Sequence, residues 1–192
     1  MSKETISSKT SFDIRSMTLV SVMTAVCCIL APVSIPIGPV PVSLSVLAVL
    51  LTAYLLGPKL GTLSILLYIL IGLAGLPVFS GYQGGPAKLF GPTGGYIIGY
   101  LPLVLISGWA VWHSPSRKWY LHLIGMAVGM LTCYALGTGW FLLLMHTSLS
   151  EALALCVYPF VAFDGVKILT ACILGNTITR ALRPILPMRT DL

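Results

Sequence analysis

Apolar residues fall in long, nearly uninterrupted blocks along this chain, separated by short gaps that are polar or rich in Gly and Pro. A helix needs about 20 apolar residues to cross the roughly 30 Å hydrocarbon core of a bilayer. Six blocks approach that length, so the pattern predicts an all-α membrane protein with six transmembrane helices in one bundle. The predicted spans cover residues 17–37, 43–56, 60–78, 94–112, 119–145 and 159–178.

Composition supports the same class. The 192 residues are 57% hydrophobic and only 8% charged, which is far from the balance of a soluble domain. No charged or Ser-rich linker divides the apolar blocks. We therefore predict a single integral membrane domain over residues 1–192, with a polar amino-terminal segment (1–16), a helical bundle (17–183) and a short tail (184–192).

Basic residues gather in alternate gaps, which predicts the orientation. Cytoplasmic loops of membrane proteins carry an excess of Lys and Arg. One set of gaps holds only Lys88, and Lys167 lies inside a span. The other set holds Lys3, Lys9, Arg15, Lys59, Arg117, Lys118, Arg180, Arg183 and Arg189. Both termini are therefore expected in the cytoplasm, and the net charge of +6 indicates membrane topology and not nucleic-acid binding.

The two main external loops, residues 31–42 and 79–95, are nearly uncharged and crowded with Pro and Gly. Pro donates no backbone hydrogen bond and Gly permits positive φ, so both favour compact, non-helical backbone. Such backbone at membrane depth must be buried in protein or line a cavity. The loops are compatible with a cap over an outward-facing pocket and equally with ordinary connections.

Asp164 and Lys167 are an opposite-charge pair within an apolar block. One ionised side chain at this depth costs roughly 3 kcal/mol on insertion scales, so the pair needs a reason to be there. Three residues apart on a helix, the two lie on one face. They either form a structural salt bridge or bind a ligand, with the carboxylate accepting ligand N–H groups and the ammonium facing a ligand anion.

The depth of the pair depends on where its helix begins. A start at Pro159 places Asp164 about 7 Å and Lys167 about 12 Å below the outer end, whereas a start near Ala152 moves both towards the middle. Aromatic residues that could form apolar pocket walls are Phe79, Tyr82, Tyr96 and Phe163.

Catalytic and metal-binding patterns are missing from the sequence. It contains no GxxxxGK[ST] phosphate loop and no HExxH, and the five cysteines show no CxxC spacing. We therefore expect no cofactor and no metal site. A Ser-Lys dyad using Lys167 remains an alternative, because spatial adjacency is not visible in a sequence.

Ser21 and Ala25 place two small residues one helical turn apart in the first span. Such spacing permits close helix approach, either within the bundle or against a partner membrane protein. We assign this pair to a partner interface.

Together, several of these residues resemble the BioY family. They are the run from Gly72 to Phe79 (GLAGLPVF), the run from Gly91 to Tyr96 (GPTGGY) followed by Gly99, and Pro159-Phe160 with Asp164 and Lys167. In that family the first external loop commonly reads Pro-x-Thr-x-Gln, whereas here the matching positions are Pro41, Ser43 and Ser45. Gln83 is the glutamine that could compensate.

The resemblance implies the biotin-specific S component of an energy-coupling factor (ECF) transporter, not an enzyme, in the bacterial cell membrane. It further implies a transmembrane coupling (T) protein and two ABC ATPase subunits as partners, which supply ATP hydrolysis. The alternatives are an intramembrane Ser-Lys enzyme and a non-transporting assembly subunit. The residues expected to bind substrate are Asp164, Lys167, Phe79, Tyr82, Gln83, Gly91, Thr93, Gly94, Gly95, Tyr96 and Ser43.

Overall fold

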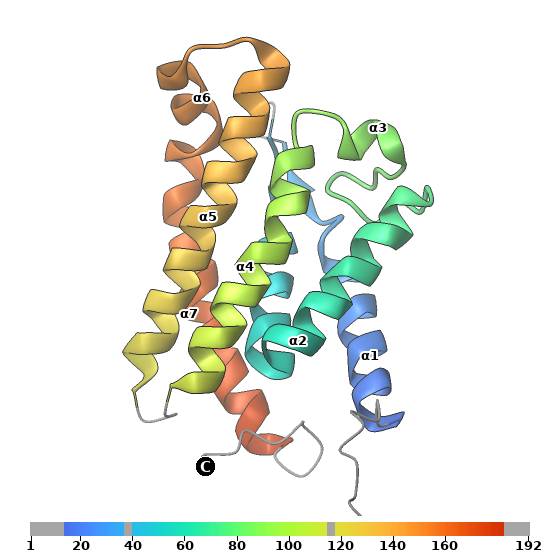
Figure 1. The fold of residues 1–192 in the computed structure, drawn as a ribbon, viewed down its shortest axis with the longest axis vertical. Helices are drawn as coiled ribbons and strands as arrows, with labels where there is room; N and C mark the ends of the chain where they lie inside the picture. Colours follow the sequence, from blue (N-terminus) through green and yellow to red (C-terminus); the bar gives the residue numbers. More distant parts are fainter. Residues whose placement is uncertain (1–13, 37–39, 115–117, 183–192) are drawn as a thin grey trace, which may run out of the picture.

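The computed structural model describes residues 14–36, 40–114 and 118–182, and these residues form a bundle of long helices (Figure 1). α2 lies at the centre, in contact with α1, α4 and α7, and α5 packs mainly on α4. The helices are α1 (Ile14–Leu30), α2 (Ser45–Leu73), α3 (Pro86–Leu89), α4 (Gly94–His113), α5 (Trp119–Met145), α6 (Leu149–Cys156) and α7 (Tyr158–Ala181).

α1 ends earlier than the sequence predicted. We expected helix to residue 37, but the last helical residue is Leu30, just ahead of Pro32, and Ile37 lies outside the described residues. Proline disfavours a helical conformation in the residue before it, which accounts for the stop. The chain then forms β1 (Ser34–Ile35), which pairs antiparallel with β2 (Val42–Ser43). The loop expected on the external side, between α1 and α2, is thus a small β-ribbon where it is described.

α2 joins two of the predicted spans and reverses direction between them. Gly57 has a non-helical φ of 71°, and Pro58 follows it at the start of the second half. A Cβ on Gly61 would lie 3.7 Å from Cα of Ala53, which a straight helix could not allow. The two halves are therefore a helical hairpin, and Figure 1 shows the chain turning back at the break. The second half ends at Leu73, not at residue 78 as predicted.

The second external loop runs from the end of α2 to the start of α4 and folds against the first. The Gly81 N–H donates to the carbonyl of Pro32, 3.1 Å away. Phe79 and Gln83 pair across a tight turn in which Gly81 and Tyr82 both have positive φ. The short α3 then leads into Gly94 at the start of α4.

α6 is a separate helix that the apolar pattern did not predict. Its amino end is a capping box: Ser148 Oγ accepts the Glu151 N–H, and Glu151 Oε2 accepts the Ser148 N–H at 3.1 Å. These bonds, chiefly the one from the Ser148 backbone, hold the pKa of Glu151 below its usual value. The chain breaks at Val157, and Pro159 occupies the first turn of α7. The start near Pro159 is therefore confirmed over a start near Ala152, which lies in α6.

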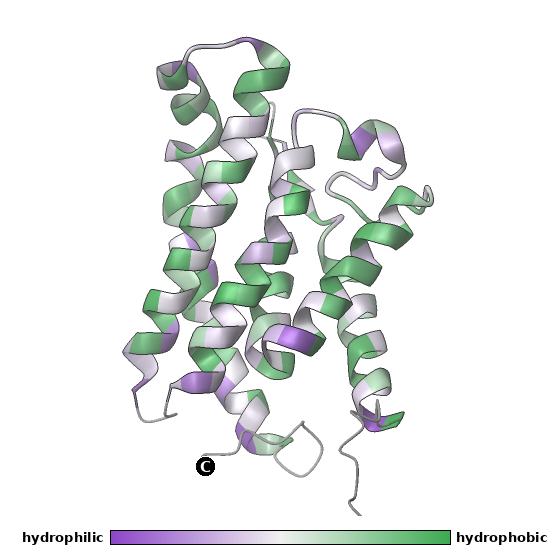
Figure 2. Ribbon diagram, viewed as in Figure 1, coloured by the Kyte–Doolittle hydropathy of each residue, from purple (hydrophilic) through white to green (hydrophobic). Residues whose placement is uncertain are grey.

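Four helices of the described chain are long and apolar enough to cross a membrane: α2, α4, α5 and α7. α1 is apolar but has only 17 residues. Hydrophobic residues cover the helices over most of their length, while hydrophilic ones cluster towards their ends (Figure 2). Many large apolar side chains are exposed, including Trp109 on α4, Leu131 on α5 and Ile173 on α7. This outer surface is that of a helical membrane protein.

Gly57 is predicted to be essential for the hairpin. A Cβ at this position would overlap the Trp112 ring, and the positive φ disfavours any L side chain. We expect Gly57→Ala to destabilise the protein by about 2 kcal/mol or more, from backbone strain and overpacking together. Thermal unfolding of the purified protein in detergent measures this.

Two control variants separate the causes. Gly75 has a φ of 103° and no atom within 4 Å of the place where a Cβ would be added. The variant Gly75→Ala therefore measures backbone strain alone. Gly139→Ala lies in α5 with open space around it and should be neutral or slightly stabilising. A Gly57→Ala protein as stable as Gly139→Ala would contradict the account.

Candidate ligand-binding site

Asp164 and Lys167 form the polar centre of the bundle. Both are buried, with 3% and 9% of their surfaces exposed, and Lys167 Nζ donates to Asp164 Oδ1 at 2.7 Å. The other carboxylate oxygen, Oδ2, accepts a hydrogen bond from the Tyr134 hydroxyl on α5 at 2.6 Å. Each carboxylate oxygen thus has one donor from the protein, which offsets the cost of burying the charge.

A cavity lies directly beside the pair. The space between its walls is about 380 Å³ when the solvent at its open mouth is counted with it. The cavity is bounded by the loop before α2 and by α2, α4, α5, the end of α6 and α7. Its lining residues are Val40, Pro41, Ser43, Val46, Tyr96, Tyr100, Met130, Cys133, Tyr134, Cys156, Phe160, Asp164 and Lys167. Largely apolar walls with a few convergent polar groups are typical of small-molecule sites.

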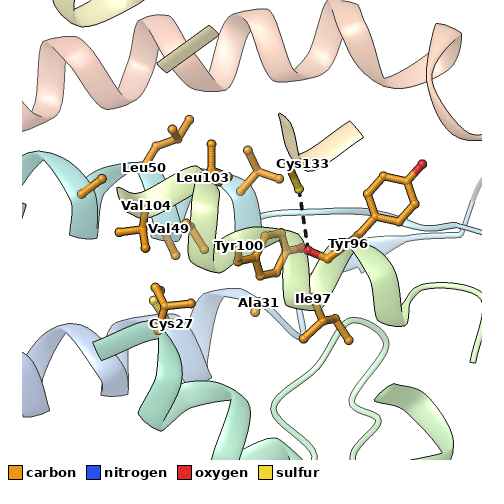
Figure 3. Packing of buried hydrophobic residues seen from close by; sticks show 14 of the residues in the cluster. Cys27, Ala31, Val49, Leu50, Tyr96, Ile97, Tyr100, Leu103, Val104 and Cys133 are labelled. Carbon is orange, nitrogen blue, oxygen red and sulfur yellow. Dashed lines mark hydrogen bonds between the residues drawn. The ribbon is translucent and has the colours of Figure 1, made fainter. Parts of the chain in front are cut away.

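Tyr96 fixes the outer rim of the cavity. Its hydroxyl hydrogen-bonds the Thr138 hydroxyl at 3.0 Å and donates to the Cys156 carbonyl at 3.3 Å. Its ring packs on Gly137, where a Cβ would overlap it. Tyr96 therefore ties the start of α4 to α5 and to the end of α6. The Cys133 thiol donates to the Tyr96 carbonyl 3.7 Å away (Figure 3).

A second polar wall comes from three hydroxyls. Ser45 Oγ lies 2.6 Å from the Tyr100 hydroxyl and also hydrogen-bonds Ser43 Oγ. All three residues are buried, and Ser43 and Tyr100 line the cavity. Figure 3 shows Tyr100 and Tyr96 on neighbouring turns of α4.

The structure brings four of the residues predicted to bind substrate to this cavity: Asp164, Lys167, Tyr96 and Ser43. Phe79 is fully buried elsewhere, with its ring edge-on to Tyr68 at 5.5 Å. Tyr82 and Gln83 are exposed at the tip of the second external loop.

The Gly-Pro-Thr-Gly-Gly segment, residues 91–95, packs against Trp140 of α5 and does not line the cavity. The Gly91 carbonyl accepts the indole N–H of Trp140 at 3.0 Å, and a Cβ on Gly95 would overlap the same side chain. Gly94 is equally tight against the Leu89 carbonyl. The buried Thr93 hydroxyl has no hydrogen-bond partner within the described residues.

Sequence reasoning missed Tyr100 and Tyr134. Each is one of two tyrosines in a long apolar helix, and nothing in the sequence around it distinguishes a pocket residue from a packing residue. Phe163, proposed as a wall, is half exposed and is not among the lining residues, whereas Phe160, one turn earlier on α7, is. Ser21 and Ala25 are exposed on α1, while Thr24 between them faces inward and hydrogen-bonds Ser64 of α2 at 3.0 Å.

The fold is that of a helical membrane protein whose bundle contains a cavity with the features of a small-molecule site. A family model described as the BioY family matches residues 3–184, and the chain belongs to that family. This confirms the family resemblance found in the sequence.

Similar proteins match over nearly their whole length. The biotin transporter BioY of Thermotoga maritima is 38% identical over 161 residues, covering 84% of this chain and 94% of the relative. Biotin transporter BioY2 of Lactococcus lactis is 38% identical over 167 residues, covering 87% and 91%. The crystal structure of an S-component for biotin from an ECF-type ABC transporter superposes with a TM-score of 0.81 at 28% identity, covering 91% of this chain and 95% of the other.

Tyr134 is predicted to stabilise the buried carboxylate. Tyr134→Phe removes one of the two hydrogen bonds that Asp164 accepts from the described protein. A hydrogen bond to a charged group contributes about 1.5–3 kcal/mol, so we expect a clearly lower unfolding temperature in detergent. Tyr120→Phe, which removes a hydroxyl from a half-exposed tyrosine at the start of α5, is the matched control. Equal stability of the two variants would show that Tyr134 contributes nothing to Asp164.

Proposed function

We propose that this chain binds biotin with high affinity and mediates its uptake as the S component of an ECF-type ABC transporter. The observation that carries the proposal is the buried Asp164–Lys167 pair, hydrogen-bonded on one side and lining a cavity on the other, in a member of the BioY family. The named relatives are transporters and not enzymes, so the intramembrane Ser-Lys enzyme is not favoured.

The pair acts as one unit at one end of the ligand. Asp164 Oδ1 and Lys167 Nζ are 2.7 Å apart, whereas the ureido ring and the carboxylate of biotin are separated by its four-methylene chain. An extended molecule cannot reach the same pair with both ends. A carboxylate has about four lone-pair sites and the protein uses two of those on Asp164, so two remain for ureido N–H groups.

The rest of the molecule then follows the apolar walls towards the external loops. Phe160, Met130 and Val46 offer apolar surface to the bicyclic ring and the chain. The valerate carboxylate lies nearest the loops, where backbone amides can bind it. Tyr82, Gln83, Gly91, Thr93, Gly94 and Gly95 remain candidates for this outer part of the site, in the loop that would cap it.

The topology we propose has six spans, with the two halves of α2 counted separately and both termini in the cytoplasm of a bacterial cell. α1 and the α2 hairpin support the count, and the distribution of Lys and Arg supports the orientation. The terminal tails that carry several of these charges lie outside the described residues. The partners are a transmembrane T protein and two ABC ATPase subunits, and the chain itself needs no cofactor.

Asp164→Asn and Lys167→Ala are each predicted to weaken biotin binding. Either change leaves a buried charge without its partner, which costs about 2 kcal/mol or more and raises the Kd at least about 30-fold. Equilibrium titration of the detergent-purified protein with labelled biotin measures the effect. Glu151→Gln and Lys59→Ala remove the same charges at exposed positions outside the cavity and should bind as the unaltered protein does. Near-normal titrations for both cavity variants would reduce the pair to a structural salt bridge.

Ala25→Trp is predicted to impair transport while leaving binding nearly unchanged. Ala25 is exposed on α1 and remote from the cavity lining, so a bulky side chain would block a close helix–helix contact without reaching the ligand. Biotin uptake by cells expressing the whole transporter is compared with titration of the purified chain. Leu131→Trp, on the exposed face of α5, is the control. Loss of uptake and binding together would place the partner interface elsewhere.

A further inference from the structure

We infer that the second external loop, residues 74–93 between α2 and α4, is a membrane-surface anchor that binds anionic phospholipid headgroups through Lys88. The inference goes beyond the proposed function and takes from it only the leaflet, which is the outer one in the proposed topology. Figure 1 shows the loop and its short helix α3 at the same end of the bundle as α6. The depth of the loop, its backbone hydrogen bonds and its exposed side chains all point to this surface.

The depth of the loop follows from the length of the helix before it. The second half of α2, from Pro58 to Leu73, has 16 residues and is therefore about 24 Å long. The hydrocarbon core of a bilayer is roughly 30 Å thick. Lys59 is exposed beside the Gly57 bend, and its charge places the bend at the headgroups of the opposite leaflet. Leu73 then ends about 6 Å short of the other headgroup layer, so the loop begins inside the membrane boundary.

The backbone of the loop is largely closed by hydrogen bonds within the protein. At membrane depth a non-helical N–H must find such a partner, because lipid tails offer none. The Gly85 N–H donates to the Gly72 carbonyl at 2.7 Å, and the Phe79 N–H donates to the Gln83 carbonyl at 2.9 Å. The N–H groups of the loop with a backbone acceptor include those of Ala74, Gly75, Leu76, Val78, Phe79, Gly81, Gly85, Lys88 and Phe90. Much of the loop can therefore lie in the headgroup layer without presenting unpaired donors to lipid.

The side chains that the loop exposes are those of a membrane interface. Leu76, Tyr82 and Phe90 are each more than half exposed, and no Asp or Glu occurs between residues 74 and 93. Aromatic side chains gather at the headgroup level of membranes, where Tyr presents an apolar ring and a polar tip. The loop thus offers apolar groups to the layer at which its depth places it.

Lys88 identifies the lipid as anionic. Its side chain is half-buried on α3, where Figure 2 shows a hydrophilic patch, and burial lowers the pKa of its ammonium. The salt bridge of the described residues joins Asp164 to Lys167, so within them Lys88 has no carboxylate partner. A cation that has lost part of its water is stabilised by a nearby anion, and the phosphate of a headgroup is the anion available at this depth. Phosphatidylglycerol adds the net negative charge that phosphatidylcholine lacks.

The test is photo-crosslinking of the full chain in nanodiscs that contain equal amounts of phosphatidylcholine and phosphatidylglycerol. Phe90→p-benzoylphenylalanine places the photoreactive group at an exposed position, and mass spectrometry identifies the adducts. We expect lipid adducts at this position, with phosphatidylglycerol enriched about threefold or more over phosphatidylcholine. Adding Lys88→Gln should lower the enrichment to about one. Lys59→Gln is the matched control, since it removes a charge at the opposite end of the same half of α2 and should leave the enrichment unchanged.

Two further positions calibrate the depth. The photoreactive residue in place of Leu131, on the exposed face of α5, should give abundant lipid adducts. In place of Glu151 it should give few, because α5 is about 40 Å long and carries the start of α6 beyond the hydrocarbon core.

A yield at position 90 as low as at position 151, or adducts to another protein chain, would overturn the inference. So would a phosphatidylglycerol enrichment that is absent or that persists in Lys88→Gln. If the Phe90 variant does not fold, the exposed Leu76 carries the same comparison. Biotin titration of the unaltered protein in the same nanodiscs tests the proposed function separately.

Discussion

The carboxylate of Asp164 is the group around which the site is organised, because an ionised oxygen inside an apolar bundle must be given hydrogen bonds. Lys167 supplies one from the next turn of the same helix, and Tyr134 supplies another from α5. These two donors use two of the carboxylate's roughly four lone-pair sites, and all three side chains line the cavity. A buried carboxylate must accept hydrogen bonds, and a ligand group that approaches it must therefore be a hydrogen-bond donor.

The surrounding fold ties together the helices that form the cavity walls. Tyr96 joins α4 to α5 and to the end of α6, so the helices that carry Tyr100 and Asp164 keep a common register. The β1–β2 pair brings Ser43 beside the start of α2, where Ser45 meets Tyr100. Glycines make these approaches possible, as at Gly137 beneath the Tyr96 ring. Packing of small residues thus lets polar side chains reach across to neighbouring helices and hydrogen-bond there.

Sequence reasoning found what stands out chemically and missed what depends on proximity. Asp164 and Lys167 are charges in an apolar block, and the BioY family follows from motifs, so the central pair and the family could be read from the chain. Tyr134 and Tyr100 could not be identified from the sequence. The Tyr134 hydroxyl meets Asp164 only because α5 packs on α7, and the Tyr100 hydroxyl meets Ser45 only because α4 packs on α2. Helix ends were predicted best at α5, where polar gaps flank the apolar block and both ends, Trp119 and Met145, are as expected. The start of α7 was one residue from the expected Pro159, and α6 was missed because its capping box lies in a gap read as a simple break.

The reversal at Gly57 also determines how the two halves of α2 can lie in a bilayer. The turn consists of little more than Gly57 and Pro58, so almost no hydrophilic connection separates the two halves of α2. The half before Gly57 has 12 residues and the half from Pro58 onward has 16, so each is shorter than the roughly 20 residues that cross a bilayer alone. We therefore expect the two halves to be stable in a membrane only as a pair, with the Trp112 ring of α4 packed over the bend.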